Sequence, residues 1–364
     1  MPNNPAPKVL KSTTQDHLDI EDIIQDLIIL KDGSVCLILE ISAINFGLFS
    51  EKEQDATIYA YAQLLNSLNF SIQIVISSKQ KDISDYLALL DKKLVEIASP
   101  LLKDQLIKYR GFVKVIVRQG NVLDKKFYIS IPFSSLELGI ATSFQSLLSM
   151  NKKASLPRPI NEIVDRAETS LAPKRDHLVR LLARIGLRAR QLVSKELLQM
   201  FFDSYNRHLL GTRVKFETKS VPDLIAPKNI DVNFNTVTID GVFYRTLFVS
   251  GYPRFVTANW LSPLINFDHS LNISMFVYPV ESKSTLDDLR RKIAEMEAEL
   301  STDLQRGRVI DPGTQAKLED ALSLQDQLVK GAERFFQFGL YVTIPASSLT
   351  ELDQVTKQVI STLG

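Results

Sequence analysis

Short runs of β-prone apolar residues alternate with longer segments of helical spacing in the first half of the chain. IIQDLIIL and VCLILEIS predict a hairpin whose turn holds Asp32 and Gly33. Ser50 and Glu53 have the spacing of a capping box, which predicts a helix over about 51–68. The same patterns predict strands over 71–77, 112–117 and 126–133 and a short strand within 188–193. They also predict helical structure over about 82–109 with a break at 99–100, and a candidate helix over 137–150. Two further helices are predicted, one over about 173–186 that ends at Gly186 and one over 195–206 that Ser194 caps.

The pattern restarts after a stretch without periodicity. The run FETKSVPDLIAPKN carries two prolines, and we interpret 211–229 as a linker. Beyond it, VNF, VTI and VFYRTLFVSG predict strands, with a turn at Asp240 and Gly241. Apolar residues at spacings of three and four predict a helical hairpin over 285–332. ISMFVYP and FFQFGLYVTI predict two more strands, and a last helix is predicted over 348–362.

These elements predict an α+β protein of two small mixed-sheet units with helices packed on the sheets. For a chain of 364 residues, two domains are the natural expectation. We divide it into a disordered tail at 1–15, an N-terminal α+β domain at 16–210, the linker at 211–229, and a second α+β domain at 230–364 that carries the long helical hairpin.

The composition is that of a globular protein. Its 43 Lys and Arg residues balance 42 Asp and Glu residues, so we do not expect direct nucleic-acid binding through bulk charge. A single cysteine, Cys36, excludes an internal disulfide framework and suits a reducing compartment. In its apolar strand it is expected to be a buried, inert thiol. The N-terminal segment lacks the apolar core of a signal peptide, and no apolar run reaches the roughly 18 residues of a membrane-spanning helix, so we expect a soluble, cytoplasmic protein.

The sequence contains no motif for catalysis or for cofactor binding. A phosphate loop, a dinucleotide fingerprint, a nucleophile elbow and paired zinc-ligand spacings are absent. Glu40 ends an apolar strand, but without a phosphate loop we expect it to face solvent. The acidic cluster over 16–22 fits the wet face of a strand better than a metal site, and the neighbours Asp268 and His269 would point to opposite faces. We therefore expect no enzyme, no metal and no cofactor.

Basic residues gather in one part of the chain. Residues 174–195 carry seven basic side chains and one acidic side chain. Arg180, Arg184 and Arg188 recur every four residues and would share one helical stripe if the helix reached that far, and Arg190 follows closely. The stripe is a candidate surface for phosphates, anionic lipid or an acidic partner. The simpler interpretation is a solvated face opposite the apolar residues of this helix.

Aromatic residues gather in the segment 245–267, which holds the only tryptophan of the chain. Tyr252 and Pro253 form a predicted turn, and Trp260 lies in a short helix predicted over about 257–264. Bulky aromatic residues in such a connection are expected to fill the core and to set the turn. A docking surface for a partner is the alternative.

Four long phrases of the chain carry a family resemblance. They are STTQDHLDI with its continuation LIILKDGSVCLILEISAINFGLFSEKEQDATIYAYAQLLNSLNF, then HLVRLLARIGLRARQLVSKELLQMFFDSYN, then TLFVSGYPRFVTANWLSPLINFDHSLNISMFVYP, and finally LRRKIAEMEAELSTDLQRGRVIDPGTQAKLEDALSLQDQLVKGAERFFQFGLYVT. Spread from Ser12 to Gly364, they resemble the N-terminal, non-motor region of the TraC-like, VirB-four-type ATPases of conjugative type IV secretion.

In that family this region precedes a RecA-like ATPase domain and engages inner-membrane components of the channel. The resemblance implies a docking and assembly role that couples the cytoplasmic motor to those components during DNA or protein transfer. It also implies peripheral association with the inner membrane through these partners. No family catalytic residue has a counterpart here, because the nucleotide site lies beyond this region. The alternative function is that this chain forms part of an active secretion ATPase, whose motor domain is on a separate chain or missing from this sequence. A motor domain and a second copy of the chain are further candidate partners.

Overall fold

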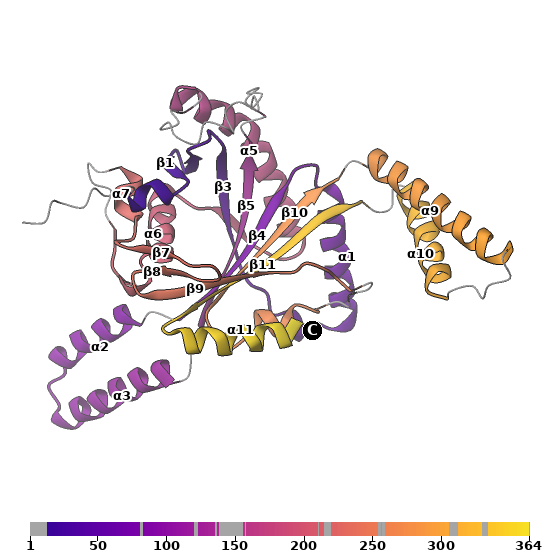
Figure 1. Cartoon of the computed structure of the whole chain (residues 1–364). Helices are drawn as coiled ribbons and strands as arrows, with labels where there is room; N and C mark the ends of the chain where they lie inside the picture. The colour runs from indigo at the N-terminus through magenta and orange to yellow at the C-terminus, as the bar shows by residue number, and fades with distance from the viewer. Residues whose placement is uncertain are drawn as a thin grey trace, which may run out of the picture.

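Strands from both halves of the chain join in one antiparallel sheet that forms the body of the protein (Figure 1). The computed structural model describes residues 13–80, 83–119, 123–134, 137, 156, 158–209, 211–214, 220–253, 256, 259–280, 282–305, 312–329 and 334–363. Helices pack on the sheet, so the predicted α+β class is confirmed. Most of the predicted tail and the candidate helix over 137–150 lie outside the described residues.

The described residues of the first half of the chain supply six strands: β1 (Ile20–Ile24), β2 (Leu27–Leu30), β3 (Val35–Ile41), β4 (Ile72–Gln80), β5 (Leu123–Phe133) and β6 (Ala189–Gln191). The predicted turn at Asp32 and Gly33 joins β2 to β3, and Gly33 has a left-handed backbone with φ of 83°. A second tight turn at Gln25 and Asp26, both with positive φ, divides the run IIQDLIIL into β1 and β2. The predicted hairpin therefore becomes a three-stranded meander.

The second half supplies five strands: β7 (Ile230–Val232), β8 (Val237–Ile239), β9 (Val242–Phe248), β10 (Leu271–Pro279) and β11 (Phe336–Ala346). Asp240 and Gly241 form the predicted turn between β8 and β9, with φ of 46° and 82°. Neighbouring strands follow the order β1-β2-β3-β5-β4-β10-β11-β9-β8-β7, and β6 pairs with the C-terminal end of β3.

The two halves meet where β10 pairs with β4. The antiparallel register runs from Ile72 opposite Val277 to Ser78 opposite Leu271. In two separate sheets each of these strands would expose a row of unpaired backbone groups, and their pairing removes both edges. The prediction of two separate sheets is wrong, because apolar periodicity identifies strands but not their partners. The domain limits at 16–210 and 230–364 stay a prediction.

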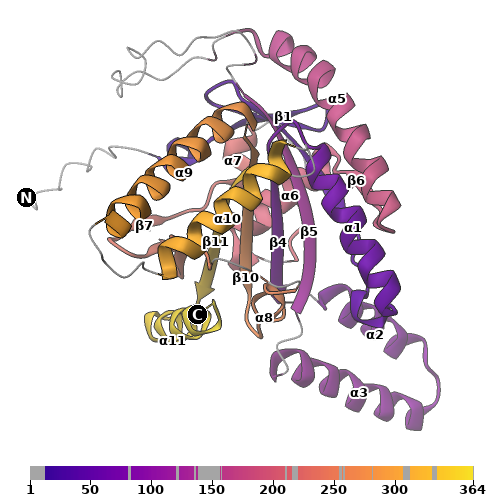
Figure 2. The same cartoon turned by 90° about the vertical axis from the view of Figure 1, so that its right-hand side faces the viewer.

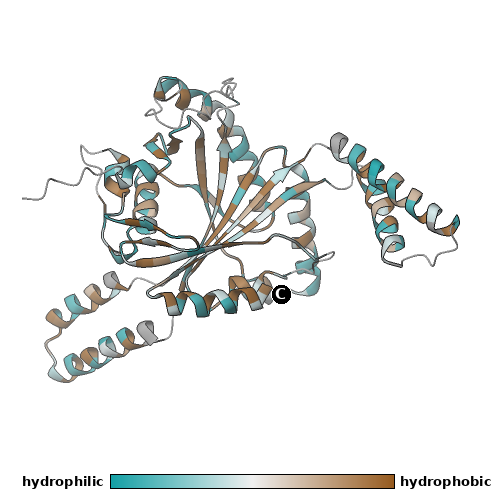
Figure 3. Cartoon of the chain, viewed as in Figure 1, coloured by the Kyte–Doolittle hydropathy of each residue, from teal (hydrophilic) through white to brown (hydrophobic). Residues whose placement is uncertain are grey.

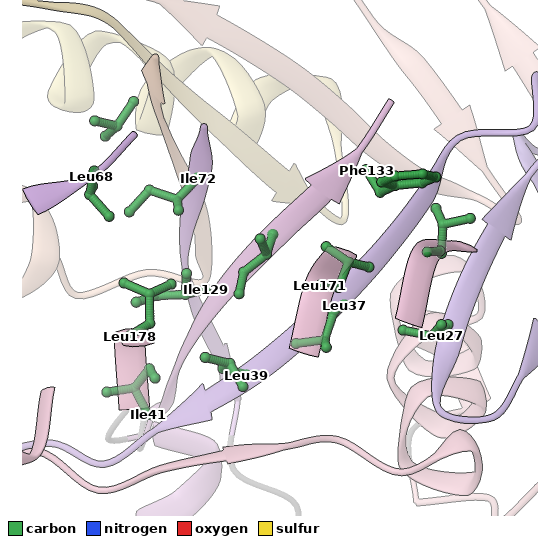
Figure 4. Close-up of a cluster of buried hydrophobic side chains, with 14 of the residues drawn as sticks. Leu27, Leu37, Leu39, Ile41, Leu68, Ile72, Ile129, Phe133, Leu171 and Leu178 are labelled. Carbon is green, nitrogen blue, oxygen red and sulfur yellow. The ribbon is translucent and has the colours of Figure 1, made fainter. Parts of the chain in front are cut away.

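One face of the sheet is covered by four helices: α1 (Glu51–Ser67), α5 (Ile160–Arg184), α8 (Ser262–Ile265) and α11 (Leu349–Leu363). Leu171 and Leu178 of α5 pack with Leu37 and Leu39 of β3 in the larger core cluster (Figure 4). Figure 2 shows α1 and α5 running along the same side of the sheet. A second cluster joins α8 and α11 to β10 and β11. The core therefore extends over both halves of the chain.

Among the residues that the structure describes, helices cover the opposite face only in part. A third cluster packs α6 (Ser194–Tyr205) and α7 (Val221–Ile225) on β1 to β3, with Leu197, Leu198 and Ile225 fully buried. Short 3-10 turns complete this region and the approach to α1: η1 (Thr14–His17), η2 (Phe46–Leu48) and η3 (Arg207–Leu209). On the strands β9 to β11, side chains of the same face are exposed, among them Phe248 and Tyr341.

Two helical hairpins project from the body (Figure 1). One consists of α2 (Ser84–Glu96) and α3 (Pro100–Gln119), and the other of α9 (Ser282–Gln305) and α10 (Pro312–Val329). The second hairpin confirms the prediction for 285–332. The strand predicted over 112–117 is wrong, because these residues continue α3. Their β-branched side chains disfavour a helix only weakly, and a strand would need a pairing partner that this projecting segment lacks among the described strands.

The helix predicted over 173–186 also differs from the structure. α5 begins at Ile160, and Pro173 lies inside it. Proline lacks the backbone N–H that a helix interior needs, so it favours a helix start. Leu171 and Leu178, on either side of Pro173, are both fully buried against the sheet, and this packing outweighs the local preference. The C-terminal limit is close to the prediction, since α5 ends at Arg184 and Gly186 adopts φ of 85°.

Candidate functional site

A pocket of about 300 Å³ lies between α6 and the strands β3, β4 and β5. The strand register explains its lining. Lys126 lies opposite Ser77, and Asp124 lies opposite Lys79, so these side chains project to one face of the sheet. The remaining lining comes from β3, β5, β6, α6 and the link between β6 and α6: Glu40, Tyr128, Arg190, Leu192, Glu196, Gln199, Met200 and Asp203.

Arg190 is the most strongly bonded residue of this pocket. Its guanidinium forms ion pairs with Glu40 of β3 and, at 2.7 Å, with Glu196 of α6. The hydrogen bond from Arg190 lowers the pKa of Glu196 below its ordinary value. Glu196 also accepts a hydrogen bond from the backbone N–H of Val193 at 3.2 Å, so it closes the first turn of α6. Arg190 therefore joins two strands to a helix, and the side chain of Glu40, which was expected to face solvent, is 26% exposed and pairs with Arg190.

Lys79 is the least solvated cation of the pocket. Burial lowers its pKa, and the nearby carboxylate of Asp203 opposes this effect in part. The Nζ atom donates to the Ser204 hydroxyl at 3.4 Å, which is a long hydrogen bond. Tyr128 lies on the neighbouring strand, and burial raises the pKa of its phenol, with Glu40 adding to the shift. Tyr128 therefore keeps its proton at neutral pH.

The charges of this pocket largely compensate each other. Lys79, Lys126 and Arg190 face the carboxylates of Glu40, Asp124, Glu196 and Asp203. A phosphate group would meet those carboxylates at once, so the pocket is poorly suited to nucleotide phosphates. Among the described residues, no group of three or more His, Cys, Asp or Glu side chains could hold a metal ion. The arrangement is best understood as a salt-linked joint that fixes α6 to the sheet.

A shallower hollow of about 520 Å³ adjoins this pocket and has a basic excess. Lys125, Lys126, Arg188 and Arg190 line it, with Glu40 as the only acidic residue of its lining. The backbone N–H of Arg188 donates to the Ser42 hydroxyl at 2.9 Å, and the carbonyl of Arg188 accepts from the Ser42 N–H at 2.8 Å. These two bonds hold the chain segment that carries Arg188 next to the end of β3.

The structure divides the predicted arginine stripe. Arg180 and Arg184 are exposed on α5, whereas Arg188 lies beyond the end of α5 at Arg184 and lines the basic hollow. Arg190 is held by its two carboxylate partners. The four residues therefore belong to two surfaces instead of one stripe. Their role in binding a partner stays a prediction.

The aromatic residues predicted around the 251–253 turn also separate. Trp260 packs against the cluster of buried residues between β10, β11 and α11. Tyr252 and Pro253 are exposed, and the Tyr252 ring lies 5.5 Å from the ring of Phe338. Trp260 thus belongs to the edge of the core, and Tyr252 lies against the partly buried ring of Phe338.

Other residues considered from the sequence also have definite surroundings. Cys36 lies at the edge of the cluster under α6, and burial raises the pKa of its thiol. His269 lies 3.3 Å from the carboxylate of Glu351. Burial lowers the pKa of His269, and Glu351 opposes the shift in part. Ser194 is the first residue of α6, and its hydroxyl bonds to Asp26 instead of capping the helix as predicted.

The uncovered half of the sheet carries an aromatic patch, which we define as Phe248, Phe276, Tyr278 and Tyr341. The ring of Tyr341 lies 5.5 Å from that of Phe276, edge to face, and 6.4 Å from that of Phe248. Tyr278 stacks nearly parallel to Phe276 at 6.3 Å. Gly339 leaves room for these rings, because a Cβ atom there would lie 3.3 Å from the Tyr341 ring.

Sequence reasoning missed this patch. Period-two alternation in β10 and β11 assigns its residues to one face, but only the pairing of β9, β10 and β11 brings them together. Two tyrosines among the alternating positions were the available signal. Exposed aromatic clusters of this kind mark binding surfaces more often than single exposed residues do.

No family model matches the chain, and no curated protein matches it. The function must therefore be inferred from the surfaces described above and from the resemblance carried by the sequence.

Proposed function

We propose that this chain is the docking and assembly region of a conjugative type IV secretion ATPase of the TraC-like, VirB-four type. In this role it couples the cytoplasmic motor to inner-membrane components of the channel during DNA or protein transfer. Support comes from the sequence phrases between Ser12 and Gly364 that resemble the non-motor region of that family. The aromatic patch is the structural observation on which the docking role rests.

The aromatic patch has the composition of a protein-binding surface. Aromatic residues are enriched and charged residues are depleted at the centres of protein interfaces. The strand positions around the four rings carry small or uncharged side chains: Gln73, Val75, Thr246, Ser274, Gly339 and Thr343. A partner helix laid on this face would bury the rings, as α6 buries the neighbouring part of the same face.

A role in docking also agrees with the chemistry of the charged pocket. Its cations are matched by carboxylates, which disfavours phosphate binding. The sequence has no glycine-rich phosphate loop that would supply clustered backbone amides. We therefore infer that this chain contributes to secretion through its binding surfaces and not through catalytic groups.

The test is co-purification of the chain with the inner-membrane components of its secretion channel, expressed together and extracted in mild detergent. We expect the wild-type chain to retain at least one of these components. The double variant Phe248→Asp/Tyr341→Asp should lose it, because a carboxylate in a dry interface is strongly disfavoured. Mating frequency should fall in parallel when this variant replaces the wild-type gene.

A matched control comes from α1 on the other face of the sheet. Tyr59 is 67% exposed, close to the 69% of Phe248. The variant Tyr59→Asp therefore tests whether replacing an equally exposed aromatic residue outside the aromatic patch also weakens binding of the channel component. This variant should retain the component. Thermal melting of all three chains checks that they are folded. Failure of the wild-type chain to retain any channel component, or equal retention by the double variant, would refute the proposed docking surface.

A further inference from the structure

The hairpin of α2 and α3 leaves many large apolar side chains in contact with solvent. Figure 3 shows apolar residues along both of its helices, which stand away from the sheet. None of its described residues belongs to the three core clusters of the body. Those at least two-fifths exposed are Tyr86, Leu89, Val95, Leu101, Leu102, Ile107, Tyr109, Phe112 and Val115. Burying even part of this surface would be favourable by about 25 cal/mol per Å².

Several of these residues share one side of α3. Leu101, Phe112 and Val115 are separated by 11 and 3 residues, which places them on one side of α3, where the ion pair of Asp104 and Lys108 also lies. They are 70%, 59% and 48% exposed. The contact of α3 with α2 uses other positions, since Arg110 pairs with Asp91 at 2.6 Å and Tyr109 bonds to Tyr86 at 3.1 Å. The apolar stripe is therefore not the seam of the hairpin.

α3 is also a strongly basic helix. Its sequence holds five basic residues and one acidic residue, Asp104. Lys108 pairs with Asp104 at 2.7 Å, whereas Lys103 and Lys114 are exposed and form no ion pair with any described residue. Lys103 and Lys114 lie on the side of α3 opposite the apolar stripe, and an apolar side combined with a basic polar side is the pattern of a helix that lies in the interface of an anionic bilayer. Each basic residue near such a surface contributes about 1 kcal/mol of attraction.

We propose that the α2–α3 hairpin binds directly to the surface of an anionic lipid bilayer. Leu101, Phe112 and Val115 enter the boundary between headgroups and acyl chains, and Lys103 and Lys114, on the opposite polar side of α3, add attraction to the anionic surface. The hairpin lies on the bilayer and does not cross it, since no described helix is long and apolar enough to span a membrane. This inference goes beyond the proposed docking to channel proteins, because it concerns a different surface and a lipid partner.

The experiment is flotation of the purified full chain with vesicles of two compositions. The anionic vesicles contain roughly 30 mol% phosphatidylglycerol, which approximates a physiological content of anionic lipid. The neutral vesicles are pure phosphatidylcholine. We expect the chain to float with the anionic vesicles, more weakly at high salt, and not with the neutral ones. The variant Leu101→Glu/Phe112→Glu should bind at least about tenfold more weakly, because it removes two inserted side chains and adds negative charge.

The other hairpin provides the matched control. Leu304 and Val329 are each 62% exposed on α9 and α10, so Leu304→Glu/Val329→Glu makes the same chemical change at a comparable exposure. This control should bind anionic vesicles as the wild-type chain does. A charge variant, Lys103→Glu/Lys114→Glu, should weaken binding and reduce its salt dependence.

Insertion into the bilayer can be measured separately by tryptophan fluorescence in the variant Phe112→Trp. The spectrum of the wild-type chain, which contains Trp260, is subtracted to obtain the emission of the introduced tryptophan. On anionic vesicles this emission should shift to shorter wavelength and be quenched by brominated lipid. Absence of flotation with anionic vesicles, equal flotation of the Leu101→Glu/Phe112→Glu variant, or an unshifted emission of the introduced tryptophan would each overturn the proposal. Binding of the hairpin to a channel protein without affinity for vesicles would do so too. None of these results bears on the Phe248 and Tyr341 docking test, so the two proposals can fail separately.

Discussion

Glu40 of β3 and Arg190 of β6 lie opposite each other in the sheet and form an ion pair across 150 residues of sequence. Arg190 also reaches Glu196 of α6, so one guanidinium connects three elements. Over half of the Arg190 side chain is exposed, at 56%. Solvent therefore screens both pairs, and their value for the fold is modest.

A double-mutant cycle on this pair should give a small coupling energy. We expect Glu40→Gln and Arg190→Gln to couple by less than about 1 kcal/mol in urea unfolding, because exposed ion pairs are screened by water and salt. The coupling should shrink further at a salt concentration of about 1 M. A coupling energy well above that, independent of salt, would contradict the description of this pair as a solvated joint.

Removing core volume under α5 should have a much larger effect. Leu178 is fully buried against the sheet, so Leu178→Ala should lower the free energy of unfolding by about 2–5 kcal/mol. Arg180 lies two residues further on the same helix and is exposed, so Arg180→Ala should change it by less than about 0.5 kcal/mol. Similar losses in both variants would mean that α5 does not pack as described.

The stability of the fold should decline at acidic pH through His269. Burial lowers the pKa of His269 below its ordinary value of 6.5, and Glu351 offsets part of the shift. In this pH range His269 binds a proton in the unfolded chain but not in the folded chain. The free energy of unfolding therefore falls as the pH drops through about 6.5 toward the pKa of His269 in the folded chain. His269→Gln should remove this part of the pH dependence in melting experiments between about pH 7 and 5.

Two companion variants sharpen this measurement. Glu351→Gln removes the carboxylate that supports the protonated imidazole, so it should lower the pKa of His269 further and extend the loss to lower pH. His17 is exposed and serves as the control, and His17→Gln should leave the pH profile of melting as it is. An unchanged profile in His269→Gln would show that another group is responsible.

Cutting the chain within 211–229 should not release two independent pieces. β4 and β10 pair over seven residues, which joins the two halves in one sheet. A chain with an inserted protease site between residues 214 and 220, once cleaved, should elute as one species in gel filtration and separate only in denaturant. Two separate folded peaks in native buffer would instead support the predicted division into two domains.

The chain by itself should neither bind ATP tightly nor hydrolyse it. Phosphoryl transfer needs clustered backbone amides, a lysine and a held metal ion around the β and γ phosphates, and the sequence has no motif that supplies them. Calorimetry with ATP and magnesium should give no saturable heat, and phosphate release should equal the blank. Stoichiometric ATP binding by the purified chain would favour the alternative of an active ATPase part.

The candidate surfaces were only partly readable from the sequence. Arg188 and Arg190 were identified by the density of basic residues, but the end of α5 at Arg184 and the pairing with Glu40 decided where they lie. The aromatic patch could not be foreseen, because Phe248, Phe276 and Tyr341 come from three strands that are distant in sequence. The exposed stripe of α3 was missed when its β-branched end was assigned to a strand.

Local features of this protein were determined by the sequence alone. The capping box at Ser50, the turns at Gly33 and Gly241 and the hairpin of α9 and α10 all depend on residues within a few positions of each other. Tertiary structure decided that β4 pairs with β10, that α5 continues through Pro173, and which half of one sheet face stays open. These outcomes depend on burial and strand pairing between distant segments, and such contacts outweigh local preferences of at most a few kcal/mol.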